Sequence, residues 1–247
     1  MAKRVCLVPP GFCLSTAGVR VQLGGTPPGE LATAPLDSAI DGPLADAIGD
    51  LVAGVRDADG TEPRFAVRSS AVGEDGSAAS YAGLHETELD VSPDGVSGAV
   101  RRCWASLWSP PAIAYRRRRE LPDTGAEMAV VVQSLVPADA AAVAFTRHPV
   151  TGRDDQMVIT TVRGLGDEMV AGTVTPDTYV IDKASGAIAA FEPGEDPGGA
   201  VLSPAALTAL GQLCPEADRR FGCAVALEAA MAGGPRALPP ARPATTG

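Results

Sequence analysis

The sequence predicts a protein of the α+β class, with helices and strands mixed along the chain. Its 247 residues, 45% of them hydrophobic, suffice for one large domain or for two closely packed lobes. Three segments place apolar residues at helical spacing: residues 44–55, 95–107 and 204–221. Three others read as strands: residues 65–67, 128–136 and 157–162.

The first third of the chain contains few regular elements. Residues 1–26 are expected to form one or two strands around a PPGF turn at residues 9–12, and residues 24–35 form a loop. The helix at 44–55 is indicated by Leu44, Ile48, Leu51, Val52 and Val55. A turn rich in Asp and Gly ends this helix, and residues 57–63 link it to the next strand.

The segment from Phe65 to Val91 has the composition of a polyphosphate site. Its first strand ends in Arg68, two serines and a polar loop that contains glycine. A second loop of small residues, 80–83, precedes another strand at 85–91. Arginine forks onto phosphate oxygens, and glycine lets backbone N–H groups approach them closely. The segment therefore indicates phosphate binding.

Two prolines, Pro110 and Pro111, divide a helical region into 95–107 and 112–121. Four consecutive arginines, Arg116–Arg119, end the second helix and suggest either a nucleic-acid contact or a solvated helix end. The net charge of −10 favours the solvated end, because nucleic-acid binding needs clustered cations. A nucleotide needs only a few local cations and usually brings Mg²⁺ with it.

The second half of the chain reads mainly as strands. The apolar strand 128–136 contains Gln133, and residues 140–146 are expected to be its hairpin partner. A turn at 148–152 precedes the strand 157–162. Residues 178–182 and 187–191 form a hairpin, and the helix 204–221 follows. In residues 225–247, the prolines at 235, 239 and 240 indicate a loop.

Cysteine spacing and hydropathy indicate a cytoplasmic protein. The five cysteines are odd in number, widely spaced and without a CxxC pair, so we expect free thiols and no disulfide or zinc site. The N-terminal apolar stretch is interrupted by Pro9 and Pro10, which makes a poor signal peptide. No segment approaches the roughly 20 apolar residues of a membrane span. Neither a membrane nor a nucleic acid is therefore expected as a partner.

Six further segments match, in order, the motifs of one family. They are Val8–Phe12, Trp104–Arg119, Met128–Val136, Phe145–Gly152 (FTRHPVTG), Gly164–Asp182 (GLGDEMVAGTVTPDTYVID) and Ala241–Pro243. With the segment Phe65–Val91, the chain resembles the nucleotide-binding domain of the pyruvate phosphate dikinase, phosphoenolpyruvate synthase and rifampin phosphotransferase group. Several ordered matches are more specific than a single phosphate-loop string.

This resemblance implies an ATP-grasp-like fold, with two lobes and the nucleotide cleft between them. The N-terminal lobe would span residues 1–127, with Arg68 and the loop 73–87 at the phosphates. The C-terminal ATP-grasp lobe would span residues 128–247 and carry the metal site. For the last part of the chain, the resemblance implies two short strands where the prolines indicate a loop.

The resemblance also implies roles for single residues. Arg68 and Arg242 would be catalytic cations at the nucleotide phosphates, and Gly83 and Thr87 would belong to the phosphate-covering loop. The other implied contacts are Gln133 and the backbone near Leu135 at the adenine, and Glu228 as the Mg²⁺ ligand. ATP and Mg²⁺ are therefore the expected cofactors, because phosphoryl transfer depends on positioning and charge neutralisation.

Each of these residues also has a structural alternative. Arg68 could form an ion pair with Glu74 or Asp75, and Gly83 could serve only a turn. Gln133 could satisfy a buried backbone group, and a lone Glu228 on a short strand could lie at the surface. His148 could accept a phosphoryl group, although its turn favours an exposed loop histidine; His85 is given no role.

The chain departs from the family pattern in three places. The family's Gly-Gly-Lys segment is absent upstream of the PPGF turn, and Lys3 is too close to replace it. The family's glutamine two residues before Arg242 is Pro240 here, which offers no side-chain oxygen. No Thr-His-Gly-Gly segment of a swivelling histidine domain follows. The third departure, beside the phosphate-side residues that are present, predicts that the phosphoryl group passes to a histidine domain on a separate partner chain, for a small-molecule acceptor.

Two alternative functions remain open at this point. A non-catalytic nucleotide-binding or scaffold subunit would explain the lost lysine and glutamine, because such losses weaken transition-state contacts more than ground-state binding. A stand-alone ATP-dependent ligase or kinase is the other alternative, although nothing in the sequence specifies its acceptor.

Overall fold

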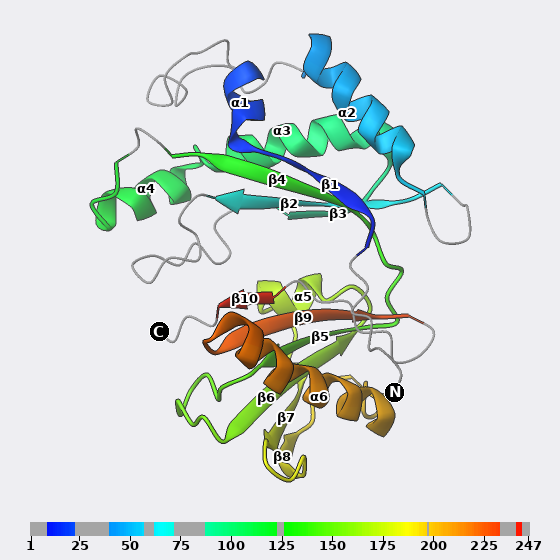
Figure 1. Cartoon of the computed structure of the whole chain (residues 1–247), viewed down its shortest axis with the longest axis vertical. Coiled ribbons are helices and arrows are strands. Elements are labelled where there is room, and N and C mark those ends of the chain that lie inside the picture. Colours follow the sequence, from blue (N-terminus) through cyan, green and yellow to red (C-terminus); the bar gives the residue numbers. More distant parts are fainter. Residues whose placement is uncertain are drawn as a thin grey trace. The chain divides into compact units, whose positions relative to one another are not determined.

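The computed structural model describes residues 9–22, 40–56, 62–71, 87–122, 126–196, 198–232 and 241–243. These residues fall into two compact units, an N-terminal unit within Pro9–Leu135 and a C-terminal unit within Val136–Gly247 (Figure 1). The units divide between Leu135 and Val136, later than the division expected after residue 127. The reason is that the strand at 128–134 pairs with strands of the N-terminal unit.

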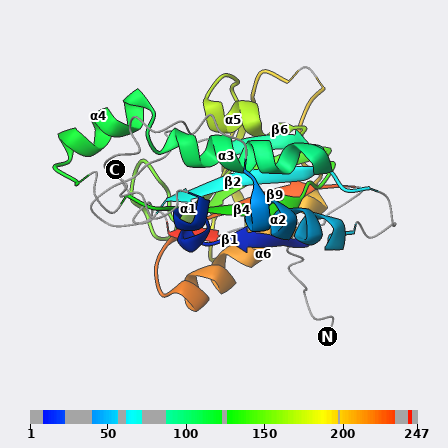
Figure 2. The same cartoon turned by 90° about the horizontal axis from the view of Figure 1, so that it is seen from above.

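The N-terminal unit contains a four-stranded antiparallel sheet with helices on one face. The strand order is β1 (Gly11–Leu14), β4 (Met128–Ser134), β2 (Phe65–Ala71) and β3 (Thr87–Val91). Figure 2 looks down on the helices α1 (Thr16–Gln22), α2 (Gly42–Gly54) and α3 (Val96–Ser106), which lie over the strands. The short helix η2 (Pro93–Gly95) leads into α3, and α4 (Pro110–Arg118) follows it.

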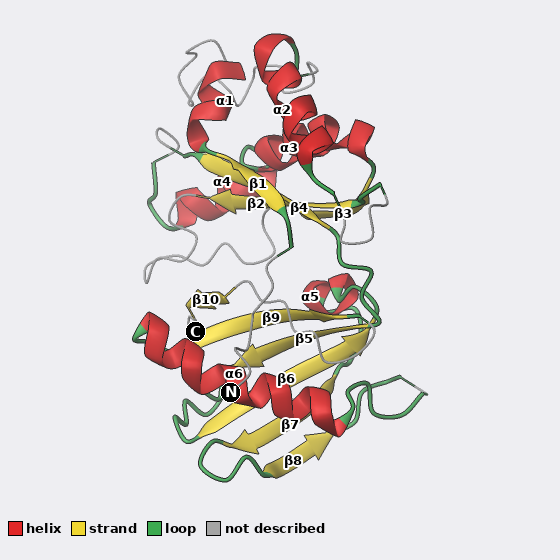
Figure 3. Ribbon diagram, turned by 45° about the vertical axis from the view of Figure 1, so that its right-hand side comes forward, coloured by secondary structure: helices red, strands yellow, loops and turns green. Residues whose placement is uncertain are grey.

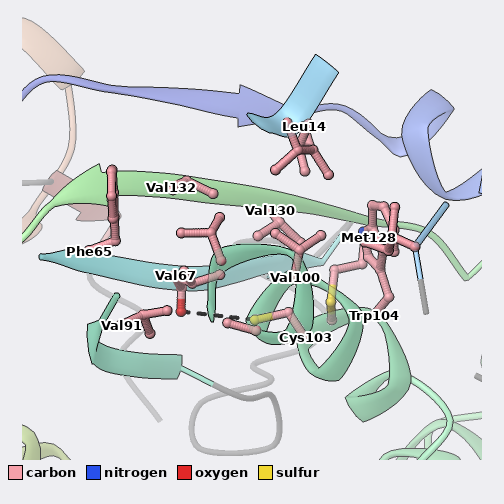
Figure 4. Close-up of a cluster of buried hydrophobic side chains, with 14 of the residues drawn as sticks. Leu14, Phe65, Val67, Val91, Val100, Cys103, Trp104, Met128, Val130 and Val132 are labelled. Atoms are coloured by element: carbon pink, nitrogen blue, oxygen red, sulfur yellow. Dashed lines mark hydrogen bonds between the residues drawn. The ribbon is translucent and has the colours of Figure 1, made fainter. Parts of the chain in front are cut away.

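The core of this unit lies between the sheet and the helices. Alternate residues of β2 and β4 point into it, among them Phe65, Val67, Val130 and Val132, all fully buried. Figure 4 shows these side chains against α3, where the Sγ of Cys103 donates a long hydrogen bond of 3.9 Å to the carbonyl of Val67. The strand period of two thus assigns one face of the sheet to packing and leaves the other face for polar side chains.

Arg116 is part of this unit's interior, which corrects one expectation from the sequence. Its side chain is buried, its Nη1 donates to the carbonyl of Leu107 at 2.6 Å, and its guanidinium lies 5.2 Å from the centre of the Trp108 ring. Arg117, Arg118 and Arg119 are exposed, as expected for a solvated helix end. The helical period turns only one of the four arginines towards the neighbouring α3 segment.

The C-terminal unit contains a six-stranded antiparallel sheet. Its order is β10 (Ala241–Pro243), β9 (Val225–Met231), β5 (Ala140–Phe145), β6 (Gln156–Arg163), β7 (Asp177–Asp182) and β8 (Ile188–Glu192). Figure 3 shows the long helix α6 (Pro204–Phe221) across one face. The short helix α5 (Asp167–Ala171) follows β6.

Helix α6 forms where the sequence provides both end signals and an apolar stripe. The Ser203 side chain accepts a hydrogen bond from Ala206 N, and Gly222 ends the helix in the left-handed region at a φ of 69°. Leu207, Leu210 and other small or apolar residues of this helix pack on alternate residues of β5, β6, β7 and β9. This packing buries one face of the six-stranded sheet.

Three expectations about elements need correction. Residues 140–145 do not form a hairpin with 128–134, because β4 pairs with β1 and β2 while β5 pairs with β6 and β9. Residues 16–22, expected within strands, form α1, because Val19 packs against the core from a helix. For residues 225–247 the loop indicated by the prolines is wrong, and the two strands implied by the resemblance are found as β9 and β10. Alternate residues of β9, namely Val225, Leu227, Ala229 and Met231, are buried, and the prolines at 235, 239 and 240 lie outside the described residues.

The buried carboxylate of Asp177 anchors the loop that joins β8 to α6. Its Oδ1 accepts from Gly194 N at 2.8 Å and its Oδ2 accepts from Val201 N at 2.9 Å. Because Asp177 is only 4% exposed, its carboxylate serves as the hydrogen-bond acceptor of both backbone N–H groups at a place shielded from water.

Among the described residues, Cys13, Cys103, Cys214 and Cys223 are free thiols, in agreement with the expectation from their spacing. Burial, with the nearby carboxylate of Asp218, raises the pKa of Cys214 to about 12. Within the same residues, no helix combines the length and the apolar character needed to cross a membrane.

Candidate nucleotide site

Three of the residues selected from the sequence lie on one face of the four-stranded sheet. Arg68 on β2 stands opposite Thr87 on β3 and opposite Val131 on β4. Gln133 stands opposite Ala66, which lies two residues before Arg68 and on the same face of β2. Since residues paired across a sheet share a face, Arg68, Thr87 and Gln133 all lie on the face away from the core.

The alternation of β4 explains why Gln133 is found in an apolar strand. Met128, Val130, Val132 and Ser134 are buried on the core side, while Gln133 is half-buried on the other side. Gly11 of the PPGF turn pairs with Gln133, and a Cβ at Gly11 would lie 2.2 Å from the carbonyl oxygen of Val132. The glycine therefore allows β1 to approach the strand that carries Gln133.

Leu135 lies at the end of the N-terminal unit. Its N–H donates to the carbonyl of Arg64 at 2.7 Å, continuing the pairing of β2 with β4. This N–H is therefore already used, and an adenine contact at Leu135 would have to come from its carbonyl oxygen. Gly83 lies outside the described residues, as do Glu74 and Asp75, the alternative partners of Arg68.

Glu228 occupies the corresponding face of the other sheet. It lies on β9 between Leu227 and Ala229, which are buried under α6, so Glu228 is on the face opposite this helix and is half-buried. It stands opposite Val143 on β5. Arg242 is placed by its backbone in β10, where it pairs with Ala226, two residues before Glu228.

The chemistry of Glu228 fits a magnesium ion held mainly by a nucleotide. Within the described residues, no three His, Cys, Asp or Glu side chains gather into a metal cluster. Mg²⁺ prefers oxygen ligands and is commonly bound through one or two carboxylates with water and substrate phosphates. One half-buried carboxylate therefore suits an ion that arrives with ATP better than a permanent structural metal.

His148 has a structural role that argues against phosphoryl acceptance. It lies in the turn between β5 and β6, and its Nδ1 accepts from Val150 N at 3.3 Å and from Thr151 N at 3.4 Å. A neutral imidazole with Nδ1 as acceptor carries its proton on Nε2. The Nδ1 lone pair is therefore directed at the backbone N–H groups of its own turn, and the histidine helps to fix that turn.

The register also brings forward a polar residue that no motif singled out. Thr160 on β6 stands opposite Val143, and Val143 stands opposite Glu228. The alternation of side chains along β6 could have indicated that Thr160 faces away from the core, because its neighbour Ile159 belongs to the core. Sequence spacing alone could not show that Thr160 and Glu228 share a row, because that depends on strand order.

Two antiparallel sheets with polar side chains opposite their cores, an arginine and a carboxylate among them, suit a nucleotide-binding domain of a phosphotransferase. Residues 30–211 match the family model described as "Pyruvate phosphate dikinase, AMP/ATP-binding domain". The chain belongs to this family. The assignment confirms the expected resemblance and the ATP-grasp-like α+β fold class, and it identifies the chain as carrying an AMP/ATP-binding domain.

Curated proteins with similar sequences include enzymes named phosphoenolpyruvate synthase. The phosphoenolpyruvate synthase of Aeropyrum pernix is 48% identical over 124 residues, which cover 50% of this chain and 15% of that protein. The prodigiosin synthesizing transferase PigC of Serratia marcescens is 40% identical over 191 residues, 73% of this chain and 21% of that protein. The probable phosphoenolpyruvate synthase of Methanothermobacter thermautotrophicus is 46% identical over 131 residues, 53% of this chain and 19% of that protein. The matched region is thus about a fifth or less of these relatives.

Proposed function

We propose that this chain binds Mg·ATP as the nucleotide-binding component of a dikinase-like phosphotransferase. It would pass a phosphoryl group to the histidine of a partner domain, which then phosphorylates a small molecule. Membership of the AMP/ATP-binding family supports the nucleotide. His148 already accepts two backbone hydrogen bonds at its Nδ1, so the proposal assigns the acceptor histidine to a partner domain.

The observation that carries this proposal is the shared face of Arg68, Thr87 and Gln133. Packing does not require a cation, a hydroxyl and an amide on three neighbouring strands, since the core lies on the other side of the sheet. Arg68 would fork onto phosphate oxygens, and Thr87 would donate its hydroxyl to them. Gln133, with the carbonyl of Leu135, would contact the adenine.

The C-terminal unit would supply the metal ligand and a second cation. Glu228 would bind Mg²⁺, and Arg242 would hold phosphate oxygens through its guanidinium. When bound, Mg²⁺ neutralises charge on the phosphates during transfer. The two arginines would orient the polyphosphate and offset its negative charge, and neither would donate or accept a proton.

Titration calorimetry with Mg·ATP tests the proposal, and Arg64 provides a matched control. Arg64 lies just before β2 and its exposed side chain pairs with Asp90 at 2.7 Å. Arg68→Ala should weaken Mg·ATP binding about tenfold or more, because a charged hydrogen-bond donor is lost. Arg64→Ala should bind as the wild type does. Equal affinity of all three proteins, or absence of binding by the wild type, would overturn the proposal.

A second function, a non-catalytic nucleotide-binding subunit, is favoured by one sequence observation. Pro240 stands where the resemblance implies a glutamine, so one side-chain oxygen for the metal is missing. Conversion of ATP to AMP and phosphate, measured with a histidine domain of the family and its small-molecule acceptor, separates the two functions. Turnover supports the phosphotransferase, whereas tight Mg·ATP binding without turnover supports the non-catalytic subunit.

A further inference from the structure

On the face of the six-stranded sheet opposite α6, one transverse row consists mostly of polar side chains. The register aligns Glu228 on β9 with Val143 on β5, Val143 with Thr160 on β6, Thr160 with Thr178 on β7, and Thr178 with Glu192 on β8. We call this set the transverse row. Four of its five members carry a carboxylate or a hydroxyl.

The neighbouring rows on the same face are mostly apolar. On one side the register aligns Ala226, Phe145, Val158, Val180 and Ala190, and Arg242 on β10 pairs with Ala226 at the end of this row. On the other side it aligns Ala230, Ala141 and Val162. The pair Gln156 and Asp182, one row beyond Val158 and Val180, also falls on this face. Among the rows that the described strands form, the transverse row holds the most polar side chains, and it starts at the carboxylate proposed to hold magnesium.

The dimensions of the row suit a metal-bound polyphosphate. Neighbouring strands lie about 4.8 Å apart, so Thr160, two strands from Glu228, is roughly 10 Å from it along the row. Val143 lies between them and offers no polar atom. A Mg²⁺ ion binds its oxygen ligands at about 2.1 Å. An ion on Glu228 followed by two or three phosphates would span this interval and end near the Thr160 hydroxyl.

The Thr160 hydroxyl has only a weak bond to give up. Its Oγ1 donates to the carbonyl of Val143 at 3.4 Å, which is long for a hydroxyl donor. A phosphate oxygen is a stronger acceptor because it is charged, and bonds of this kind are shorter. The hydroxyl can exchange the first bond for the second by rotation about χ1, without moving the strand.

We propose that Thr160 is a further nucleotide-binding residue, whose hydroxyl donates to a phosphate oxygen of the Mg²⁺-bound polyphosphate. The proposal rests on the proposed function, because it takes Glu228 as the magnesium ligand. A structural role would look different: Thr160 and Thr178 face each other on β6 and β7, and such pairs stabilise a sheet on their own. The experiment has to separate these two roles.

Calorimetric titration of the full chain with Mg·ATP compares the wild type with Thr160→Val, Thr160→Ser and Thr178→Val. Valine keeps the β-branched shape and removes only the hydroxyl. Thr160→Val should raise the Kd about tenfold, through loss of one hydrogen bond to a charged group. Thr160→Ser should stay within about twofold of the wild type, because a hydroxyl is retained. Thr178→Val breaks the same threonine pair but leaves the Thr160 hydroxyl, so its Kd should not change.

Each outcome decides the matter. If Thr160→Val and Thr178→Val weaken binding equally, Thr160 acts through the sheet and the inference is overturned. If Thr160→Val binds as the wild type does while Arg68→Ala loses affinity, only this inference fails and the proposed function stands. If the wild type does not bind Mg·ATP, both fail. Melting temperatures of the unliganded variants confirm that the sheet is intact.

Discussion

Replacing Gly166 with alanine tests how the loop after β6 is held against the sheet. Gly166 has a φ of 83°, and an added Cβ would lie 2.5 Å from the Cβ of Ala141 on β5. Gly164, two residues earlier in the same loop, has a φ of 78° and no atom within 4 Å of an added Cβ. Gly164→Ala is therefore a matched control with the same backbone strain and no collision.

The expected magnitude follows from two separate costs. An L-residue in the left-handed region costs about 1–2 kcal/mol, and both variants carry this cost. Only Gly166→Ala carries the collision, and overpacking of this kind costs about 1–3 kcal/mol. Gly164→Ala should therefore lose about 1–2 kcal/mol of stability, and Gly166→Ala about 2–5 kcal/mol. The difference between the variants measures the contact with Ala141.

The measurement must report on the C-terminal unit. Both tryptophans of the chain, Trp104 and Trp108, lie in the N-terminal unit, so tryptophan fluorescence would not follow the right sheet. Native-state hydrogen exchange, read by mass spectrometry on peptides from β5 and β6, gives the free energy of opening locally. Equal losses for the two variants, within about 0.5 kcal/mol, would refute the close approach of Gly166 to β5.

Three other predictions concern stability, thiol reactivity and pH. Asp177→Ala should lower the free energy of unfolding by about 3 kcal/mol, because two backbone N–H groups lose their acceptor. Asp177→Asn keeps one acceptor oxygen, so its loss of unfolding free energy in the same hydrogen-exchange measurement should be smaller. The exposed Cys223 should react with a thiol reagent at pH 8 in the native protein, whereas the buried Cys214, with a pKa of about 12, should react only after unfolding. The variants Cys223→Ser and Cys214→Ser identify which phase of the reaction, before or after unfolding, belongs to each thiol. Asp182 accepts hydrogen bonds from the hydroxyl and the N–H of Ser185, and these bonds lower its pKa. Its stabilising contribution is therefore fully present above pH 4 and is lost as the pH falls through the lowered pKa. Melting temperatures of the wild type and Asp182→Asn should differ at about pH 6, and the difference should shrink steadily as the pH falls below about 4.

The sequence was most informative where local signals and burial agree. Helix α6 follows the expected range 204–221, because a capping serine directly precedes its apolar stripe and a terminal glycine directly follows it. The strand β4 is found at 128–134 within the expected 128–136, because its alternation of buried positions is unbroken. Period and capping are local properties, and a single sequence carries them in full.

Strand pairing and the burial of single polar residues are not local properties. Nothing within residues 128–145 shows that β4 and β5 belong to different sheets, since two apolar strands joined by a short link also form hairpins. Arg116 could not be separated from its three arginine neighbours, because its burial depends on the position of Leu107 and Trp108 in the folded chain. Both features are decided by which surfaces meet in three dimensions.

The period of two in the strands also separates residues that fold this protein from those proposed to act. In both units the core takes one face of each sheet, and the candidate residues Arg68, Gln133 and Glu228 fall on the other face. Shifting any of these strands by one residue would move its polar groups into the core and its core residues out of it. Packing therefore fixes the face on which the polar residues stand without fixing their identity. Substitutions at these positions should change nucleotide binding far more than stability, and a large loss of stability in Arg68→Ala would show that its face is part of the folding core after all.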